Sequence, residues 1–198
     1  MAAGVNVSPR RMPTLFFLLP LISVVAIYIA RLIELGTKRQ LIAGQIRENL
    51  TLRLFLLAGT VIFAGAIAEY LGLRPGLRWG PFSAGWVCAV ASFAIRRQAI
   101  AALGKFWSLH VEIRDNHEFV QSGPFRWVRH PAYFSMILEL LALALICNAF
   151  FTLLLIPLLF VPVLILRIRI EEVALVEKFG DAYRTFQRTK PALIPWKW

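Results

Sequence analysis

The chain has 198 residues, of which 59% are hydrophobic and 17% charged, and its mean hydropathy is +0.67. Soluble domains are closer to about half apolar and about a quarter charged, so this composition argues against a soluble enzyme, a disordered tail or a disulfide scaffold. The net charge of +11 would suggest nucleic acid in a soluble chain, but in a membrane protein it is typical of cytoplasmic loops. We therefore expect a polytopic membrane protein.

The chain contains four apolar stretches, at 14–30, 54–73, 81–95 and 134–166. A membrane helix needs about 20 such residues, so the last stretch is long enough for two helices. The strongly polar residue near the middle of this stretch is Asn148, and we expect a turn at Cys147-Asn148-Ala149. The sequence thus predicts an all-α protein with five transmembrane helices, of which the last two form a hairpin.

The basic residues are divided unevenly between the two predicted sides. The N-terminal tail, the connection near 74–80 and the hairpin tip hold four of the 22 Lys and Arg residues, and the other three polar segments hold the remaining 18. By the positive-inside rule, this second side faces the cytoplasm. The host membrane stays open between a bacterial inner membrane and the endoplasmic reticulum.

We expect one domain, residues 1–198, with three transmembrane helices in 1–100 and the cofactor-binding and catalytic half in 101–198. The segments 96–133 and 167–198 lie on the predicted cytoplasmic side and are the polar parts large enough to build an aqueous site. Cys88 and Cys147 lie in apolar runs, and the histidine spacing fits no zinc pattern, so no metal site is expected.

The polar segment before the fourth helix has a turn, Ser122-Gly123-Pro124-Phe125, and then a basic stretch that ends at Pro131. Proline is favoured in the first turn of a helix, so we expect a helix to begin there. Its N-terminus, with Arg126, Arg129 and His130 nearby, favours either an anionic ligand group or a simple interfacial cap. Both interpretations stay open at this point.

Arg167 and Glu171 follow the fifth apolar helix and share one helical face, because they are four residues apart. They form either a surface salt bridge or part of a site, in which Arg167 holds a carboxylate and Glu171 balances a cation. Glu139 is an acid inside the fourth helix, and it either serves the site or pairs with an arginine of a neighbouring helix. Glu69 is expected to extend to the membrane surface.

The C-terminal tail carries an apolar stripe at helical spacing, formed by Leu175, Phe179, Tyr183 and Phe186. We expect this stripe to pack the tail over the site and to take no part in catalysis. Trp196 and Trp198 are typical of interfacial anchors.

Two blocks of the sequence resemble the isoprenylcysteine carboxyl methyltransferases and, in part, the related phospholipid methyltransferases. The first block runs from His117 to Tyr133 and includes Gly123-Pro124-Phe125-Arg126 and Arg129-His130-Pro131. The second block follows the predicted hairpin and consists of Arg167, Glu171-Glu172, Leu175, Phe179-Gly180, Tyr183 and Ile194-Pro195. The resemblance covers about residues 104–196, and Phe125 departs from it because tyrosine is commoner there.

The resemblance implies S-adenosylmethionine as the methyl donor. Matching positions imply that the cofactor-binding residues are His110, His117, Glu118, Phe119, Val120, Phe125, His130, Pro131, Ala132, Tyr133 and Glu171. Arg167 and Glu171 would be the catalytic residues, and Arg167 would also bind the acceptor, with Glu139 as a second substrate-binding residue.

The sequence therefore predicts an S-adenosylmethionine-dependent carboxyl O-methyltransferase whose lipophilic or isoprenylcysteine-like acceptor enters from the bilayer. The alternatives are a phospholipid or other amine N-methyltransferase, a nicotinamide-dependent membrane reductase and a non-catalytic scaffold. Membrane lipids are expected as partners, whereas nucleic acid and an obligate protein partner are not.

Overall fold

The computed structural model describes residues 14–36, 45–46, 50–107, 112–113 and 120–194. The helices are α1 (Thr14–Gly36), α2 (Leu50–Leu73), α3 (Trp79–Leu103), η1 (Gly104–Phe106), η2 (Gly123–Arg126), α4 (Pro131–Ile146), α5 (Phe150–Leu155), η3 (Ile156–Phe160), α6 (Val161–Phe179) and α7 (Asp181–Thr189). Two strands of two residues each, β1 (Gln45–Ile46) and β2 (Glu112–Ile113), pair antiparallel. The described chain is otherwise helical, as predicted.

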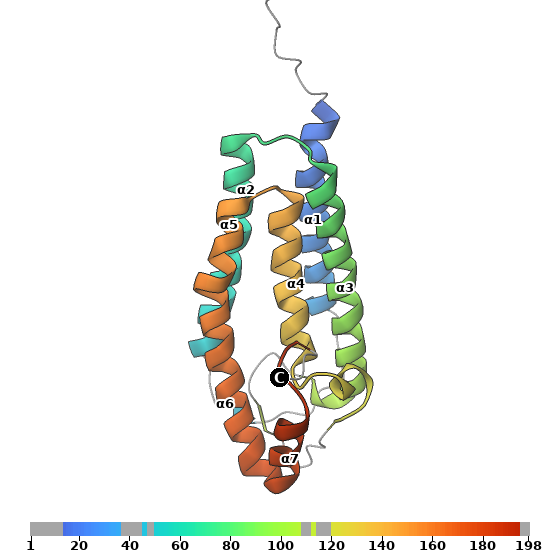
Figure 1. Ribbon diagram of the computed structural model, residues 1–198, viewed down its shortest axis with the longest axis vertical. Coiled ribbons are helices and arrows are strands. Elements are labelled where there is room, and N and C mark those ends of the chain that lie inside the picture. Colours follow the sequence, from blue (N-terminus) through green and yellow to red (C-terminus); the bar gives the residue numbers. More distant parts are fainter. Residues whose placement is uncertain (1–13, 37–44, 47–49, 108–111, 114–119, 195–198) are drawn as a thin grey trace, which may run out of the picture.

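The long helices run side by side along the long axis of the molecule, and α7 lies at the end where α6 finishes (Figure 1). The helix α4 lies at the centre of the bundle, where it contacts α1, α2, α3 and α5. The segments α5, η3 and α6 follow one another without a break, and η3 is a π-helical turn that contains Pro157. A proline lacks a backbone N–H, and such a turn accommodates it.

Four helical segments are long and apolar enough to cross a membrane: Leu15–Glu34, Leu50–Leu73, Trp79–Phe106 and Phe150–Phe179. Large apolar side chains such as Val87, Phe151 and Leu158 are exposed on the outside of the bundle, as expected for contact with lipid. The fourth predicted span, α4, is a shorter apolar helix of 16 residues. The membrane crossing of α4, and with it the five-span count and the membrane hairpin, stays a prediction.

The connection between α4 and α5 is held by polar contacts. The helix breaks at Cys147–Ala149, where the sequence predicted a turn, and Asn148 adopts a positive φ of 51° that asparagine tolerates. Glu69 of α2 accepts hydrogen bonds from the backbone N–H groups of Phe151 and Thr152, at 3.0 and 2.7 Å. The carboxylate of Glu69 therefore caps the N-terminus of α5, and its extension to the membrane surface stays a prediction.

The helices α3 and α4 pack closely through small residues. Gly85 faces Ala142 and Ile146, and a Cβ atom at Gly85 would lie 2.7 Å from Cγ1 of Ile146 and 2.9 Å from the carbonyl oxygen of Ala142. The hydroxyl of Ser92 then donates to the carbonyl of Ser135 at 2.7 Å. Small residues let the backbones of membrane helices approach and gain dispersion contacts. This packing fixes α4, whose first turn carries site residues.

Replacement of Gly85 by alanine tests this contact. We expect Gly85→Ala to destabilise the protein by about 1–3 kcal/mol, because the added methyl group overlaps the α4 backbone. The measurement is the unfolding temperature in detergent, with Gly80→Ala as control, since nothing lies within 4 Å of a Cβ at Gly80. Equal unfolding temperatures for the two variants would contradict the close contact.

Candidate functional site

A cavity of about 460 Å³ lies among α1, α2, α4, α6 and α7, and Phe106, Trp107 and Phe125 complete its wall. The predicted site residues that line it are Val120, Phe125, His130, Pro131, Ala132, Tyr133, Glu139, Arg167 and Glu171. His110, His117, Glu118 and Phe119 lie outside the described residues. Residues from both predicted sequence blocks thus meet at one cavity, and their individual roles stay predictions.

The hydroxyl group of Tyr133 joins Arg167 to Glu171. Nε of Arg167 donates to the tyrosine oxygen at 3.0 Å, and the tyrosine hydroxyl donates to Oε2 of Glu171 at 2.7 Å. Nη1 of Arg167 also donates to Oγ1 of Thr51 on α2, at 3.3 Å. Arg167 is only 2% exposed, so the surface salt-bridge interpretation does not hold. A buried, bridged cation and carboxylate form part of the cavity wall.

Two aromatic rings lie close to the guanidinium of Arg167. The guanidinium carbon of Arg167 lies 6.0 Å from the ring centre of Phe55 and 5.9 Å from that of Tyr133. The ring faces carry negative partial charge and stabilise a cation in a desolvated place. The rings of His130 and Tyr133 are stacked at 5.6 Å, so the first turn of α4 presents both to the cavity.

Glu172 connects the start of α4 to α7. Its Oε1 lies 3.0 Å from Nε2 of His130 and 2.7 Å from Nε of Arg129, and its Oε2 accepts from Nε2 of Gln187 at 3.0 Å. The other ring nitrogen of His130, Nδ1, lies 3.9 Å from Oε1 of Glu171. Glu172 was not predicted as a site residue, although it adjoins Glu171 in the motif. It fixes the orientation of His130.

The basic start of α4 is only partly as predicted. Pro131 does begin the helix. Arg129 is engaged by Glu172 and by the carbonyl groups of Gln187 and Lys190, so it holds the tail. Arg126 is exposed and does not line the cavity, so it is not close to the predicted anion site.

The backbone of the tail is fastened to the same place. The N–H groups of Arg129 and His130 donate to the carbonyl groups of Pro191 and Ala192, each at 2.9 Å. The tail therefore packs against the first residues of α4, close to the cavity.

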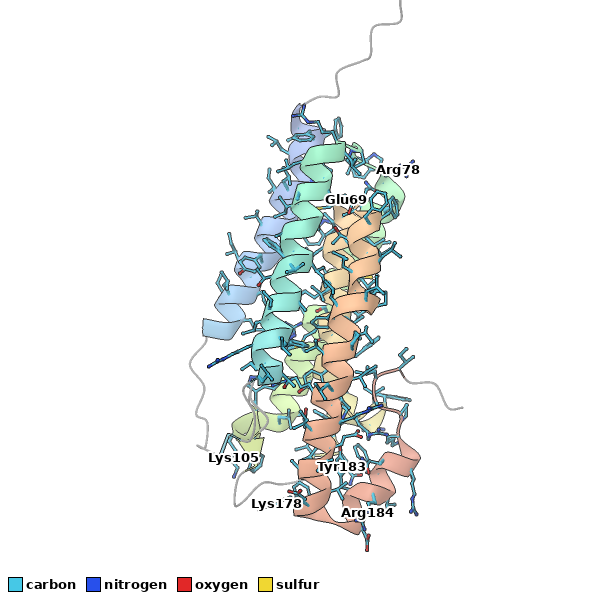
Figure 2. All side chains as sticks on the ribbon, turned by 90° about the vertical axis from the view of Figure 1, so that its left-hand side faces the viewer. Glu69, Arg78, Lys105, Lys178, Tyr183 and Arg184 are labelled. Atoms are coloured by element: carbon cyan, nitrogen blue, oxygen red, sulfur yellow. The ribbon has the colours of Figure 1, made fainter. Side chains whose placement is uncertain are left out.

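The apolar stripe of the tail lines the cavity, but it is not one continuous helix as its spacing predicted. Gly180, with a φ of 56°, separates α6, which carries Leu175 and Phe179, from α7, which carries Tyr183 and Phe186. Figure 2 shows Tyr183 where α7 folds back beside α6. Burial and the nearby carboxylates of Glu172 and Glu171 raise the pKa of Tyr183, so its phenol stays neutral.

A second polar group lies deeper, and we call Arg31, Glu34, Arg96 and Glu139 the charge cluster. Nη1 of Arg31 is 2.6 Å from Oε2 of Glu34, and Nη1 of Arg96 is 3.5 Å from the same oxygen. Arg96 also pairs with Oε2 of Glu139. Of the two interpretations of Glu139, its pairing with an arginine of a neighbouring helix is confirmed, and its role in the site stays a prediction.

Sequence reasoning missed Arg31, Glu34 and Arg96 as part of this cluster. It assigned them to loops because they follow the predicted spans 14–30 and 81–95. In the structure α1 and α3 continue past these points, so the side chains remain within the helices. Their position directly after an apolar run, at the end of the bundle that carries the site, was the sequence signal that could have assigned them to the helices.

Comparison with known proteins gives the family. Residues 85–177 match the isoprenylcysteine carboxyl methyltransferase (ICMT) family, and this range contains α4, Tyr133, Arg167 and Glu171. The protein YpbQ of Bacillus subtilis, itself uncharacterized, is 32% identical over 59% of this chain and 69% of its own length.

Two further relatives match over shorter parts of their length. An uncharacterized protein of Haemophilus influenzae is 35% identical over 46% of this chain and 55% of its own length. The protein-S-isoprenylcysteine O-methyltransferase of Schizosaccharomyces pombe is 31% identical over 51% of this chain and 44% of its own length. The family match and these relatives agree with the apolar helices described above. This chain belongs to the isoprenylcysteine carboxyl methyltransferase family.

Proposed function

We propose that the protein is a membrane carboxyl O-methyltransferase that uses S-adenosylmethionine and methylates a lipophilic carboxylic acid. Its family implies a methyltransferase. The observation that carries the proposal is the buried Arg167, bridged by Tyr133 to Glu171 in the wall of one cavity. This arrangement supplies one group that attracts a carboxylate and one that attracts a cation.

The chemistry of the cavity suits this donor. A volume of about 460 Å³ is within the range of about 300–1,000 Å³ that is typical of cofactor and ligand sites. Rings of Trp107, Phe125 and Phe179 offer stacking surfaces for a purine, and Glu171 with the Tyr133 ring offers a setting for a sulfonium cation. Arg129 also lines the cavity, and although its guanidinium is engaged by Glu172 and the tail, its positive charge would attract the carboxylate of the donor.

The cavity opens where a lipid tail can enter. Its lining includes Leu32 of α1, 50% exposed, and Leu56 of α2, 59% exposed, so it reaches the outer surface of the bundle between these helices. Figure 2 shows α1 and α2 next to each other, without α4 or α6 between them. An acceptor that enters here from the bilayer need not carry its tail through water.

The position of the cavity in the bundle indicates which side of the membrane it faces and which helices would bind the donor and the acceptor. The cavity lies at the end of the bundle where α1 and α3 finish and α2 and α4 begin, which is the end rich in Lys and Arg (Figure 1). By the positive-inside rule this end faces the cytoplasm, from which a polar donor arrives. Within one domain, α4, α6 and α7 would bind the donor, and α1 and α2 would cover the acceptor.

The mechanism needs positioning more than proton transfer. The bound donor supplies a methyl group on a positively charged sulfur. A carboxylic acid with a pKa of about 4 is already ionised at pH 7, so the acceptor needs no general base. Arg167 would hold the carboxylate, and its bond to Tyr133 fixes the guanidinium plane. Orientation of two reactants can lower a barrier by about 7–11 kcal/mol.

The donor site is tested by titration of S-adenosylmethionine and S-adenosylhomocysteine into the detergent-purified protein. We expect binding in the wild type and loss of at least about tenfold in affinity in His130→Ala and Glu171→Ala, because each removes a polar group from the donor side. Asp181→Ala removes an exposed acid on α7 and should bind as the wild type does. No binding by the folded wild type would contradict the proposed donor.

The acceptor site is tested by replacement of Arg167. We expect Arg167→Gln to lower kcat/KM for transfer to N-acetyl-S-farnesylcysteine by about a hundredfold, because the carboxylate loses its charged holder. Arg184→Gln, an exposed arginine on α7, is the matched control and should keep full activity. Equal activity of both variants would show that Arg167 does not hold the acceptor.

A milder variant guards against misfolding, since Arg167 is buried. Tyr133→Phe keeps the ring that packs beside Phe55 and His130 but removes the bridge between Arg167 and Glu171. It should fold with a near-normal unfolding temperature and lose about tenfold in kcat/KM. Wild-type activity of a folded Tyr133→Phe protein would show that the hydroxyl bridge between Arg167 and Glu171 is not needed for catalysis.

A further inference from the structure

The cavity wall contains a second polar region, formed by Arg31 and Glu139, which the methyl-transfer step does not use. We propose that Arg31 and Glu139 form a subsite that binds a hydroxyl or amide group in the middle of the acceptor, between its carboxylate and its apolar end. The inference rests on the proposed function and adds a substrate class, a lipophilic acid with a polar group within its chain.

The position of this pair along the cavity supports the proposal. Glu139 follows Tyr133 by six residues in α4, which corresponds to about 9 Å along the helix axis. Both residues line the cavity, so an acceptor held at Arg167 would pass Glu139 as it extends into the bundle. Further along α4 and α2 the lining is apolar, with Leu143 and Phe63.

The hydrogen bonding around the pair leaves room for a ligand. Oε2 of Glu139 is paired with Arg96, whereas Oε1 lies 3.8 Å from Nε of Arg31, beyond hydrogen-bond distance. Within the part of the chain that the structure describes, no hydrogen bond to Oε1 of Glu139 is found. A hydroxyl group, which is both donor and acceptor, can bind beside this pair, where it donates to Oε1 of Glu139 and accepts from the guanidinium of Arg31.

The charge cluster contains one residue that only holds helices together, Arg96, and two that face the cavity, Arg31 and Glu139. The side chain of Arg96 is 0% exposed, and it holds α3 to α4 through Glu139 and, at 3.0 Å, through Oγ of Ser135. Arg31 and Glu139 retain 12% and 14% exposure and line the cavity. Arg31 and Glu139 are therefore accessible to a ligand in the cavity, whereas Arg96 is not.

The test compares the binding of hexadecanoic acid with that of its monohydroxy derivatives, a set of positional isomers in which the hydroxyl group is moved stepwise along the middle of the chain. Affinities are measured by calorimetry on the full chain in detergent with S-adenosylhomocysteine present. A hydrogen bond to a charged group corresponds to about tenfold or more in affinity, so the best isomer should bind about tenfold more tightly than the parent acid. The preference should fall to about threefold or less in Arg31→Met and in Glu139→Gln.

Glu69→Gln is the matched control, because Glu69 is also a carboxylate within a predicted span but does not line the cavity. It should keep the full preference even if its unfolding temperature falls. Equal binding of all acids to the wild type would overturn the subsite and leave the proposed function standing. A preference that survives in folded Glu139→Gln and Arg31→Met would also overturn it. If no acid binds the wild type at all, the proposed acceptor class fails, and the subsite with it.

Discussion

Charged side chains within a membrane bundle need partners there, because hydrocarbon offers neither hydrogen bonds nor counter-charge. This constraint organises the structure. Glu69 accepts hydrogen bonds from the first N–H groups of α5, and Arg96 pairs with Glu139 and Ser135, so these charged groups hold helices together. Arg167 is held by Tyr133 and Thr51 and still lines a cavity. Charges that are both anchored and accessible in this way are the ones suited to bind substrates.

The site depends on contacts between distant parts of the chain. Tyr133 of α4 meets Arg167 and Glu171 of α6, while Glu172, the next residue of α6, secures His130. Arg129 in turn holds the carbonyl groups at the end of α7. Because these bonds share the first turn of α4, its close packing on α3 determines how accurately the site is built.

The sequence predicted the parts of this arrangement that depend on local patterns. Apolar length located the helices, Pro131 located the start of α4, and the spacing of Arg167 and Glu171 placed them on one face. The resemblance of two separate motifs indicated that they meet, and the structure brings their described residues to one cavity.

The remaining features depend on which side of a helix faces its neighbours. The spans α2 and α3 are apolar all round, since lipid is as apolar as the protein interior, so periodicity does not show their rotation. The roles of Glu69 and Arg96 follow from that rotation. The break at Gly180 was missed for a different reason, because the stripe on either side of it keeps helical spacing.

The most direct test of the account is the chemical nature of the transferred methyl group. The protein in lipid vesicles would receive S-adenosylmethionine with a labelled methyl group and either N-acetyl-S-farnesylcysteine or its carboxamide. A carboxyl methyl ester releases its label as volatile methanol in alkali, whereas a methylated amine does not. We expect volatile label from the acid and none from the carboxamide. Label that resists alkali and appears in amine-bearing lipids would contradict carboxyl methylation.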